Sequence, residues 1–150
     1  MLIGVISDTH GRLPARVHDV FTGVDAIVHA GDVGDERVLE ELETIAPVLA
    51  VRGNDDDGDL AWRLKATDVR DYGSSRLLVG HARSTLLAAG VPSGVDIVVT
   101  GHTHRPEIES DGGVLYLNPG TAAGERRGGG HTVALLTVTD DGLQVRIVGL

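Results

Sequence analysis

The sequence predicts an α/β fold with parallel strands, and two observations support this prediction. In the first third of the chain, short apolar runs rich in β-branched residues alternate with segments whose apolar residues repeat at helical spacing. The rest of the chain has more apolar runs and the turn sequences Asp111-Gly-Gly and Asp140-Asp-Gly, which favour antiparallel hairpins. A length of 150 residues suits one compact domain, which we place at residues 1–150.

The individual elements follow from the spacing of the apolar residues. Leu2-Ile-Gly-Val-Ile6 is apolar throughout, as is typical of a buried strand. Val38, Leu39 and Leu42 share one helical stripe, and Pro47 follows the end of that helix. Strands are predicted at residues 2–7, 25–30, 48–51, 76–79, 95–99, 114–117, 133–138 and 143–148, and helices at residues 14–21 and 35–45.

Composition limits the function classes that the chain can serve. It has no cysteine, so any metal must be held by His, Asp, Glu or Asn rather than by thiolates. A net charge of −9, with Lys65 as the only lysine, would repel a nucleic-acid backbone, and we do not expect nucleic acid as a partner. The acidic bias also fits adaptation to high salt; a melting temperature that stays flat from low to molar KCl would contradict that hypothesis.

The chain has no apolar run of membrane-spanning length, and its first residues lack the pattern of a secretion signal. We therefore expect a cytoplasmic protein with no membrane partner. A homo-oligomer stays open as an alternative to a monomer.

Polar side chains follow most of the predicted strands. In open α/β sheets the carboxyl ends of the strands bind ligands, so we expect these side chains to converge on one rim. Asp8 and His10 are two residues apart, and on an extended chain both would project to the same side. The seven candidate metal-binding residues are Asp8, His10, Asp32, Asn54, His81, His102 and His104.

Seven oxygen and imidazole groups are too many for one ordinary metal site, whereas two metals that share a carboxylate would use about this number. Asp32, in a Gly-Asp turn, is the expected bridge. Two divalent ions about 3.5–4 Å apart acidify a shared water and stabilise a displacement at phosphorus. Taken singly, each motif also fits a simpler structure. Asp8-Thr-His10 fits a helix cap with a surface histidine, and Gly31-Asp32 and Gly53-Asn54 fit ordinary turns. Gly101-His-Thr-His104 fits a site for a single metal ion.

Together the motifs resemble the calcineurin-like metallophosphoesterase family, in particular its small bacterial and archaeal phosphodiesterases. The resemblance spans residues 1–127. It implies a four-layer α/β/β/α sandwich of two mixed sheets flanked by helices, and a phosphodiesterase that acts on a small phosphoester. The matching segments are Asp8-Thr-His10, Gly31-Asp32, Gly53-Asn-Asp-Asp56, His81, Gly101-His-Thr-His104 and Asn118-Pro-Gly-Thr121.

The resemblance also implies how the site works. A hydroxide bridging two divalent metals would attack phosphorus, with manganese as the expected metal and iron, zinc or nickel as alternatives. Asp32, Asn54 and Asp55 are the candidate catalytic residues. The first metal would be held by Asp8, His10, Asp32 and His104, and the second by Asp32, Asn54, His81 and His102.

The sequence departs from the family pattern at Asp55, where many relatives have a histidine that protonates the leaving group. A carboxylate is a poor acid at neutral pH unless its pKa is raised, so the leaving-group acid is open. Arg83, and Arg126 and Arg127 in a loop that ends in Gly128-Gly-Gly130, either bind phosphate or face solvent.

His29 is a candidate for orienting a ligand, and Asn118 for supporting the site through a turn. The alternative function is a non-catalytic protein-binding scaffold that keeps the phosphoesterase fold. The presence of every proposed ligand argues against this alternative.

Overall fold

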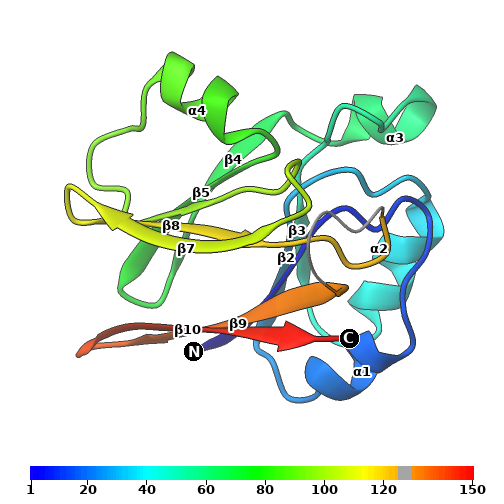
Figure 1. Cartoon of the computed structure of the whole chain (residues 1–150), viewed down its shortest axis with the longest axis horizontal. Coiled ribbons are helices and arrows are strands. Elements are labelled where there is room, and N and C mark those ends of the chain that lie inside the picture. The colour runs from blue at the N-terminus through cyan, green and yellow to red at the C-terminus, as the bar shows by residue number, and fades with distance from the viewer. Residues whose placement is uncertain (125–129) are drawn as a thin grey trace.

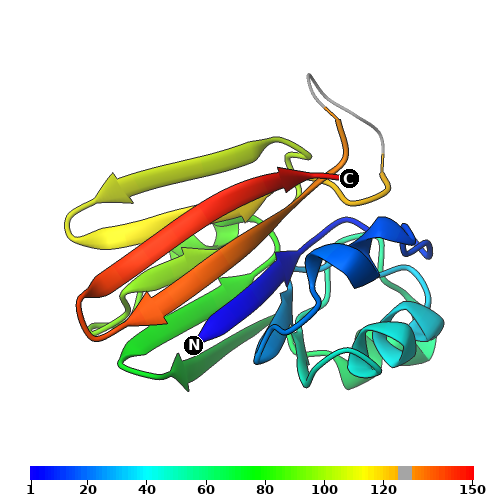
Figure 2. The same cartoon turned by 90° about the horizontal axis from the view of Figure 1, so that it is seen from below.

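The computed structural model, which describes residues 1–124 and 130–150, contains two five-stranded sheets packed face to face (Figures 1 and 2). The first sheet consists of β1 (Leu2–Ile6), β2 (Ala26–His29), β3 (Val48–Ala50), β9 (Thr132–Thr139) and β10 (Gly142–Gly149), in the order β10-β9-β1-β2-β3. The second consists of β4 (Thr67–Tyr72), β5 (Ser75–Gly80), β6 (Ile97–Val99), β7 (Pro106–Asp111) and β8 (Val114–Pro119), in the order β4-β5-β6-β8-β7.

Both sheets are mixed, and each has three neighbouring parallel strands. β1, β2 and β3 are parallel in the first sheet, as are β5, β6 and β8 in the second. Antiparallel strands complete the sheets: β9 and β10 beside β1, β4 beside β5, and β7 beside β8. The hairpins predicted at Asp111-Gly-Gly and Asp140-Asp-Gly are therefore confirmed as the β7–β8 and β9–β10 connections.

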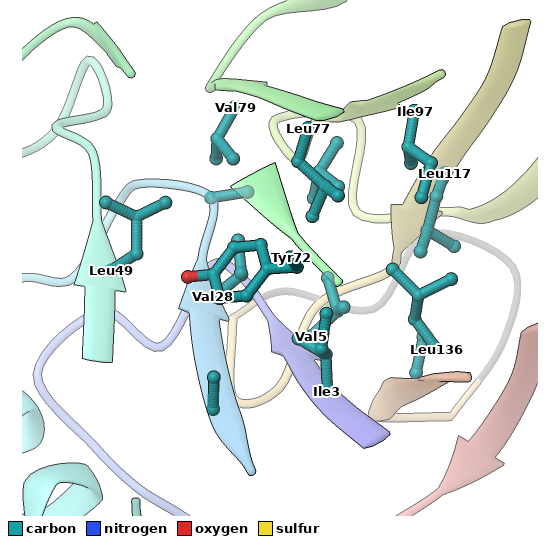
Figure 3. Close-up of a cluster of buried hydrophobic side chains, with 14 of the residues drawn as sticks. Ile3, Val5, Val28, Leu49, Tyr72, Leu77, Val79, Ile97, Leu117 and Leu136 are labelled. Carbon is teal, nitrogen blue, oxygen red and sulfur yellow. The ribbon is translucent and has the colours of Figure 1, made fainter. Parts of the chain in front are cut away.

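Successive side chains of a strand point to opposite faces of its sheet, so a strand such as β1 contributes both to the core between the sheets and to the core under the helices. Ile3 and Val5 of β1 join the cluster between the two sheets, to which Leu77 and Val79 of β5 also belong (Figure 3). Ile6 faces the other way, toward the helices of the first sheet. The helices are α1 (Arg16–Val20), α2 (Glu36–Glu43), α3 (Gly58–Arg63) and α4 (Arg83–Ala89).

Helices cover the outer face of each sheet. α1 and α2 bury Val17 and Leu42 against the first sheet, whereas α4 buries Leu86 against Leu78 and Val98 of the second. The predicted four-layer α/β/β/α sandwich is thereby confirmed. No helix in the described ranges is long and apolar enough to cross a bilayer.

Four elements were not predicted: α3, α4, β4 and β7. β7 is exposed at every residue and carries Glu107, Glu109 and Asp111, so it has no buried face that a pattern of apolar residues would indicate. β4 and β7 are the two edge strands of their sheet, where charged residues protect against unwanted pairing. Arg126, Arg127 and most of the predicted glycine loop lie outside the described residues.

Gly4 lets the ring of Phe21, directly after α1, lie against β1. A Cβ added at Gly4 would lie 2.9 Å from Cδ1 of the fully buried Phe21. We expect Gly4→Ala to lower the free energy of unfolding by about 1–3 kcal/mol, measured by urea denaturation. Gly149→Ala in β10, where nothing lies within 4 Å of an added Cβ, is the matched control. Equal losses in the two variants would contradict a packing role for Gly4.

Candidate metal centre

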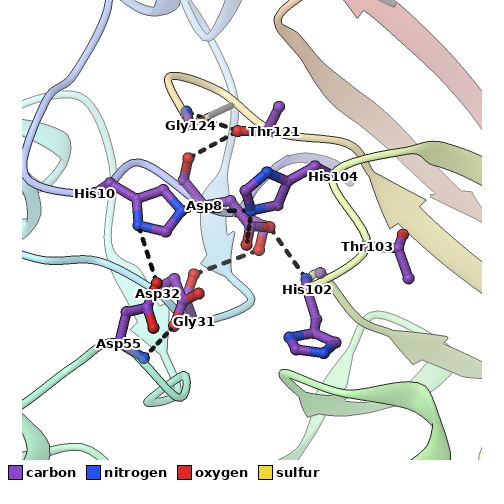
Figure 4. A network of polar contacts seen from close by, with 12 residues as sticks. Asp8, His10, Gly31, Asp32, Asp55, His102, Thr103, His104, Thr121 and Gly124 are labelled. Atoms are coloured by element: carbon purple, nitrogen blue, oxygen red, sulfur yellow. Dashed lines mark hydrogen bonds and ion pairs between the residues drawn. The ribbon is translucent and has the colours of Figure 1, made fainter. Parts of the chain in front are cut away.

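Residues that follow the six parallel strands meet at one end of the sandwich, where they form a compact polar cluster (Figure 4). In each of three overlapping groups, the carboxylate oxygens and imidazole nitrogens lie within 4.8 Å of one another. Five of the seven predicted ligands, together with Asp55, belong to these groups, and Asp8, His10 and Asp32 each belong to two. The groups are Asp8–His10–His104, Asp8–Asp32–His81 and His10–Asp32–Asp55.

The backbone of the cluster is unusual, because five of the seven candidate ligands adopt left-handed conformations. In the described part of the chain, the non-glycine residues with positive φ are Asp8, His10, Asp32, His102 and His104, at 56°, 45°, 53°, 70° and 59°. This conformation costs roughly 1–2 kcal/mol per residue, and such residues cluster at functional sites. The expectation that Asp8-Thr-His10 is extended is therefore wrong: two left-handed residues, rather than strand alternation, bring Asp8 and His10 together.

Glycines next to the ligands allow the loops to approach closely. A Cβ on Gly53 would collide with the side chain of Asp32, and a Cβ on Gly101 with Oγ of Ser7. Each glycine of these Gly-Asn and Gly-His motifs is thus needed for space rather than for a turn.

Asp8 is fully buried, and one of its carboxylate oxygens faces the imidazole of His104. Its Oδ2 accepts a hydrogen bond from the backbone N–H of His102 at 3.2 Å. Its Oδ1 has no hydrogen-bond partner, although it lies 3.1 Å from Nε2 of His104, which is itself 3.4 Å from Nε2 of His10. Burial raises the pKa of Asp8. A buried carboxylate oxygen and two ring nitrogens that face one another fit a cation held between them.

His81 presents a second group of this kind. Its Nδ1 lies 2.8 Å from the carbonyl oxygen of Ala30, which can only accept a hydrogen bond, so Nδ1 carries a proton. In the neutral ring the free lone pair is therefore on Nε2. The buried Nε2 has no hydrogen-bond partner and lies 3.2 Å from Oδ2 of Asp32. Two acceptors at this distance repel each other unless a proton or a metal ion lies between them.

The pKa values of this pair move in the directions that favour the charged forms. Burial alone would lower the pKa of His81, but the Asp32 carboxylate and the Ala30 carbonyl outweigh it and raise that pKa. Burial alone would raise the pKa of Asp32, but His81 and the backbone N–H of Asp55 outweigh it and lower that pKa. Asp32 is thus held as an anion at the centre of the cluster.

Asn54 and His102 lie beside the cluster rather than within its three groups. Nδ1 of His102 lies 2.9 Å from Oδ1 of Asn54, and the His102 ring centroid is 5.1 Å from that of His81. Nδ2 of Asn54 donates to Oδ1 of Asp55 at 2.7 Å, and the backbone N–H of Asp55 donates to Oδ1 of Asp32 at 2.8 Å. The ligand candidates therefore form two sets, one around Asp8 and one around His81, with Asp32 in contact with both.

Asp56 is a supporting residue that sequence reasoning missed. Its Oδ1 accepts from the backbone N–H of Gly34 and its Oδ2 from that of Gly53, both at 2.8 Å. The buried carboxylate thus ties the loop after β2 to the loop after β3. Its place at the end of the Gly53-Asn-Asp-Asp56 motif was the signal that would have found it.

His29 orients the loops that carry the ligands. The backbone N–H of Gly31 donates to its Nδ1 at 3.3 Å, so the neutral ring donates from Nε2 to Oγ1 of Thr9 at 2.9 Å. Burial lowers the pKa of His29 to about 4, which keeps the ring neutral. Thr9, between Asp8 and His10, in turn donates to the carbonyl oxygen of Val33 at 2.9 Å.

The segment that ends β8 anchors the cluster from the opposite side. Oγ1 of Thr121 donates to the carbonyl oxygen of Asp8 at 3.0 Å (Figure 4). Nδ2 of Asn118 donates to the carbonyl oxygen of Gly101 at 2.7 Å. Arg83, by contrast, lies 2.6 Å from Oε2 of Glu109, which neutralises its charge.

Comparisons with known proteins agree with this arrangement. The profile of the calcineurin-like phosphoesterase superfamily domain matches residues 1–141. The chain is 39% identical to a probable metallophosphoesterase of Methanocaldococcus jannaschii, over 81% of this chain and 68% of that protein. It is 32% identical to a phosphodiesterase of the same organism, over 83% and 86% of the two chains.

The fold is also found in a crystal structure of Vps29 from Entamoeba histolytica. The TM-score is 0.79 at 24% identity, and the match covers 100% of this chain and 99% of that one. At this identity the likeness concerns the fold alone. The sequence matches go further, and on them the chain belongs to the calcineurin-like phosphoesterase superfamily.

Proposed function

We propose that this chain is a phosphodiesterase whose centre holds two divalent metal ions, with manganese as the resident metal. The observation that carries the proposal is the pair of buried atoms without hydrogen-bond partners, Oδ1 of Asp8 and Nε2 of His81. Each faces another potential ligand atom at 3.1–3.2 Å, an arrangement that a cation would stabilise.

The two sets of contacts support a division of the proposed ligands between two ions. Two divalent ions bound there would lower the pKa of a shared water, supply a hydroxide for attack on phosphorus and neutralise the charge that develops on the phosphoryl oxygens. Asp32 touches both sets and is the carboxylate best placed to be shared. Asp8, His10, Asp32 and His104 would hold one ion, and Asp32, Asn54, His81 and His102 the other.

The chain's own groups fix the orientation of these ligands. The Ala30 carbonyl holds the proton of His81 on Nδ1, which leaves Nε2 for a metal. Asp55 accepts from the amide nitrogen of Asn54, which turns the amide oxygen of Asn54 toward His102. We therefore propose that Asp55 is a positioning residue for Asn54.

Metal analysis combined with phosphoesterase assays tests the proposal. We expect protein loaded with manganese, iron, zinc or nickel to hold two ions per chain. We also expect it to hydrolyse bis(p-nitrophenyl) phosphate faster than p-nitrophenyl phosphate. A fully loaded protein that hydrolyses neither compound would overturn the catalytic proposal.

The role of Asp55 has its own test. We expect Asp55→Ala to lower kcat only a few-fold, because it loosens Asn54 without removing a ligand. If Asp55 were the leaving-group acid, kcat would fall by about 10²–10⁴-fold for an alkyl leaving group and far less for p-nitrophenyl, which needs no protonation. Equal small losses for both leaving groups support positioning, and a loss confined to the alkyl ester would make Asp55 the acid.

A second candidate is a non-catalytic protein-binding scaffold, which the likeness in fold to Vps29 favours. A protein that binds no metal, and whose partners are unchanged by Asp32→Ala, would establish that role instead. A cytoplasmic location and a single domain at residues 1–150 remain predictions.

A further inference from the structure

His102 lines two cavities. One, of about 430 Å³, is also lined by Asn54 and His81, and the other, of about 530 Å³, by Thr103, Arg105 and Glu107. Both volumes lie in the range of small-molecule sites. A monoester has one organic group to place beside the phosphorus, whereas a diester has two. The centre thus has room for both ester arms of a phosphodiester.

The lining of the cavity on the Asn54 side contains no carboxylate and has few charged groups. Its lining includes the hydroxyls of Thr67 and Thr85 and the apolar side chain of Leu86. Its one arginine, Arg52, already donates from Nη1 to the carbonyl oxygens of Ala61 and Leu64, at 3.2 and 3.4 Å. This cavity suits an uncharged organic group.

The other cavity is lined by one cation, Arg105, and one carboxylate, Glu107, and that carboxylate lies 3.4 Å from Nη1 of Arg83. Within residues 1–124 and 130–150, the side chain of Arg105 makes no hydrogen bond or ion pair, and only its backbone N–H bonds, to Oγ1 of Thr103 at 3.4 Å. Most other cations of the described chain are neutralised by carboxylates. Those in ion pairs are Arg37, Arg63, Lys65, Arg70, Arg76 and Arg83.

The charge of Arg105 matters because its surroundings are acidic. The chain has a net charge of −9, and Asp8, Asp32 and Asp55 lie in the neighbouring cluster. An anionic group on a substrate would be repelled there unless a local cation received it. A guanidinium is well suited to this, because it binds carboxylate or phosphoryl oxygens through two parallel hydrogen bonds.

We propose that the substrate is an asymmetric phosphodiester. One ester arm is an uncharged organic group that occupies the cavity beside Thr85, and the other carries a second anionic group, a carboxylate or a phosphoryl group, that Arg105 binds. This inference rests on the proposed function, because it assigns the two arms around the same metal centre.

The test uses three p-nitrophenyl phosphodiesters whose second arm is butyl, carboxypropyl or phosphopropyl. With manganese-loaded wild-type protein we expect KM to be about tenfold lower for the two anionic arms than for butyl. Arg105→Met should remove this preference and leave kcat and the butyl KM within about twofold, and Arg105→Lys should restore part of it. Arg146→Met, at an exposed arginine of β10 outside both cavities, is the control.

The outcomes separate this inference from the function on which it rests. If the loaded wild-type protein hydrolyses none of the three diesters, the proposed function fails. If it hydrolyses all three with equal KM, and Arg105→Met changes none of them, the function stands and the assignment of Arg105 is overturned. A preference for only one anionic arm would identify the group as a carboxylate or a phosphoryl group.

A second variant tests the cavity beside Thr85. Thr85 is exposed on α4, so Thr85→Trp should fill the cavity without disturbing the core. We expect KM for the butyl diester to rise about tenfold, with metal content and melting temperature unchanged. An unchanged KM would show that neither ester arm lies in this cavity.

Discussion

Asp32→Asn is expected to lower kcat for phosphodiester hydrolysis by about a thousandfold. The substitution keeps the shape of the side chain but replaces a carboxylate oxygen with an amide NH₂, which cannot bind a metal. Asp32 lies 3.2 Å from Nε2 of His81 and belongs to two of the three candidate groups, so the two proposed ions would lose the carboxylate that they share. The measurement is kcat with bis(p-nitrophenyl) phosphate, combined with elemental analysis of the purified variant.

The control for this change is Asp111→Asn, which removes an equal charge from an exposed position in the β7–β8 hairpin. We expect the control to keep its activity and metal content. Asp32→Asn should remain folded, because the backbone N–H of Asp55 still has an amide oxygen to bond to. If Asp32→Asn keeps more than about a tenth of the wild-type kcat, the shared-carboxylate assignment is wrong.

Asp8→Asn is expected to be more stable than the wild type without metal and less stable than the wild type with metal. Without metal, the variant should be more stable than the wild type by about 1–3 kcal/mol, because the buried Oδ1 of Asp8 has no hydrogen-bond partner. Asparagine also tolerates the φ of 56° at this position. With metal, the wild type should be the more stable protein, since only it keeps the carboxylate ligand.

The shift in the pKa of Asp8 explains why Asp8→Asn should stabilise the protein when no metal is bound. Burial raises this pKa, so the ionised carboxylate costs stability, and the cost is complete once the pH exceeds the folded-state pKa. At a manganese concentration about a hundred times Kd, the wild type should gain about 2.7 kcal/mol, or about 5–10 °C in Tm. Thermal unfolding with manganese and with a chelator measures both effects. A wild type that is the more stable protein without metal would contradict the expected cost of the buried carboxylate.

The sequence predicted the core strands well, because burial leaves a direct pattern in residue type. β1 and β5 face the inter-sheet core with Ile3, Val5, Leu77 and Val79, and their apolar runs carried the prediction. β7 has no buried face, so its pairing with β8 depends on backbone hydrogen bonds that any residue can make. Local propensity does not reveal an exposed edge strand of this kind.

The convergence of the candidate ligands could be predicted from the sequence, whereas their backbone conformation could not. Ligands that directly follow strands were expected at one rim, and the structure brings Asp8, Asp32 and His81 together there. The left-handed conformation of Asp8 and Asp32 was not predicted, because it is imposed by surrounding contacts rather than by residue type. Asp56 was missed because its role is to bond two backbone amides from distant loops, which only the folded chain shows.

The left-handed backbone at the candidate ligands also affects which substitutions the protein can tolerate during evolution. Glycine or asparagine would relax the backbone at these positions, so exchanging His102 or His104 for either residue would remove strain while it removes a ligand. Such a substitution would therefore raise the folding stability and lower the proposed activity. Under the proposed function, the five left-handed residues therefore carry a cost in folding stability that metal binding would offset.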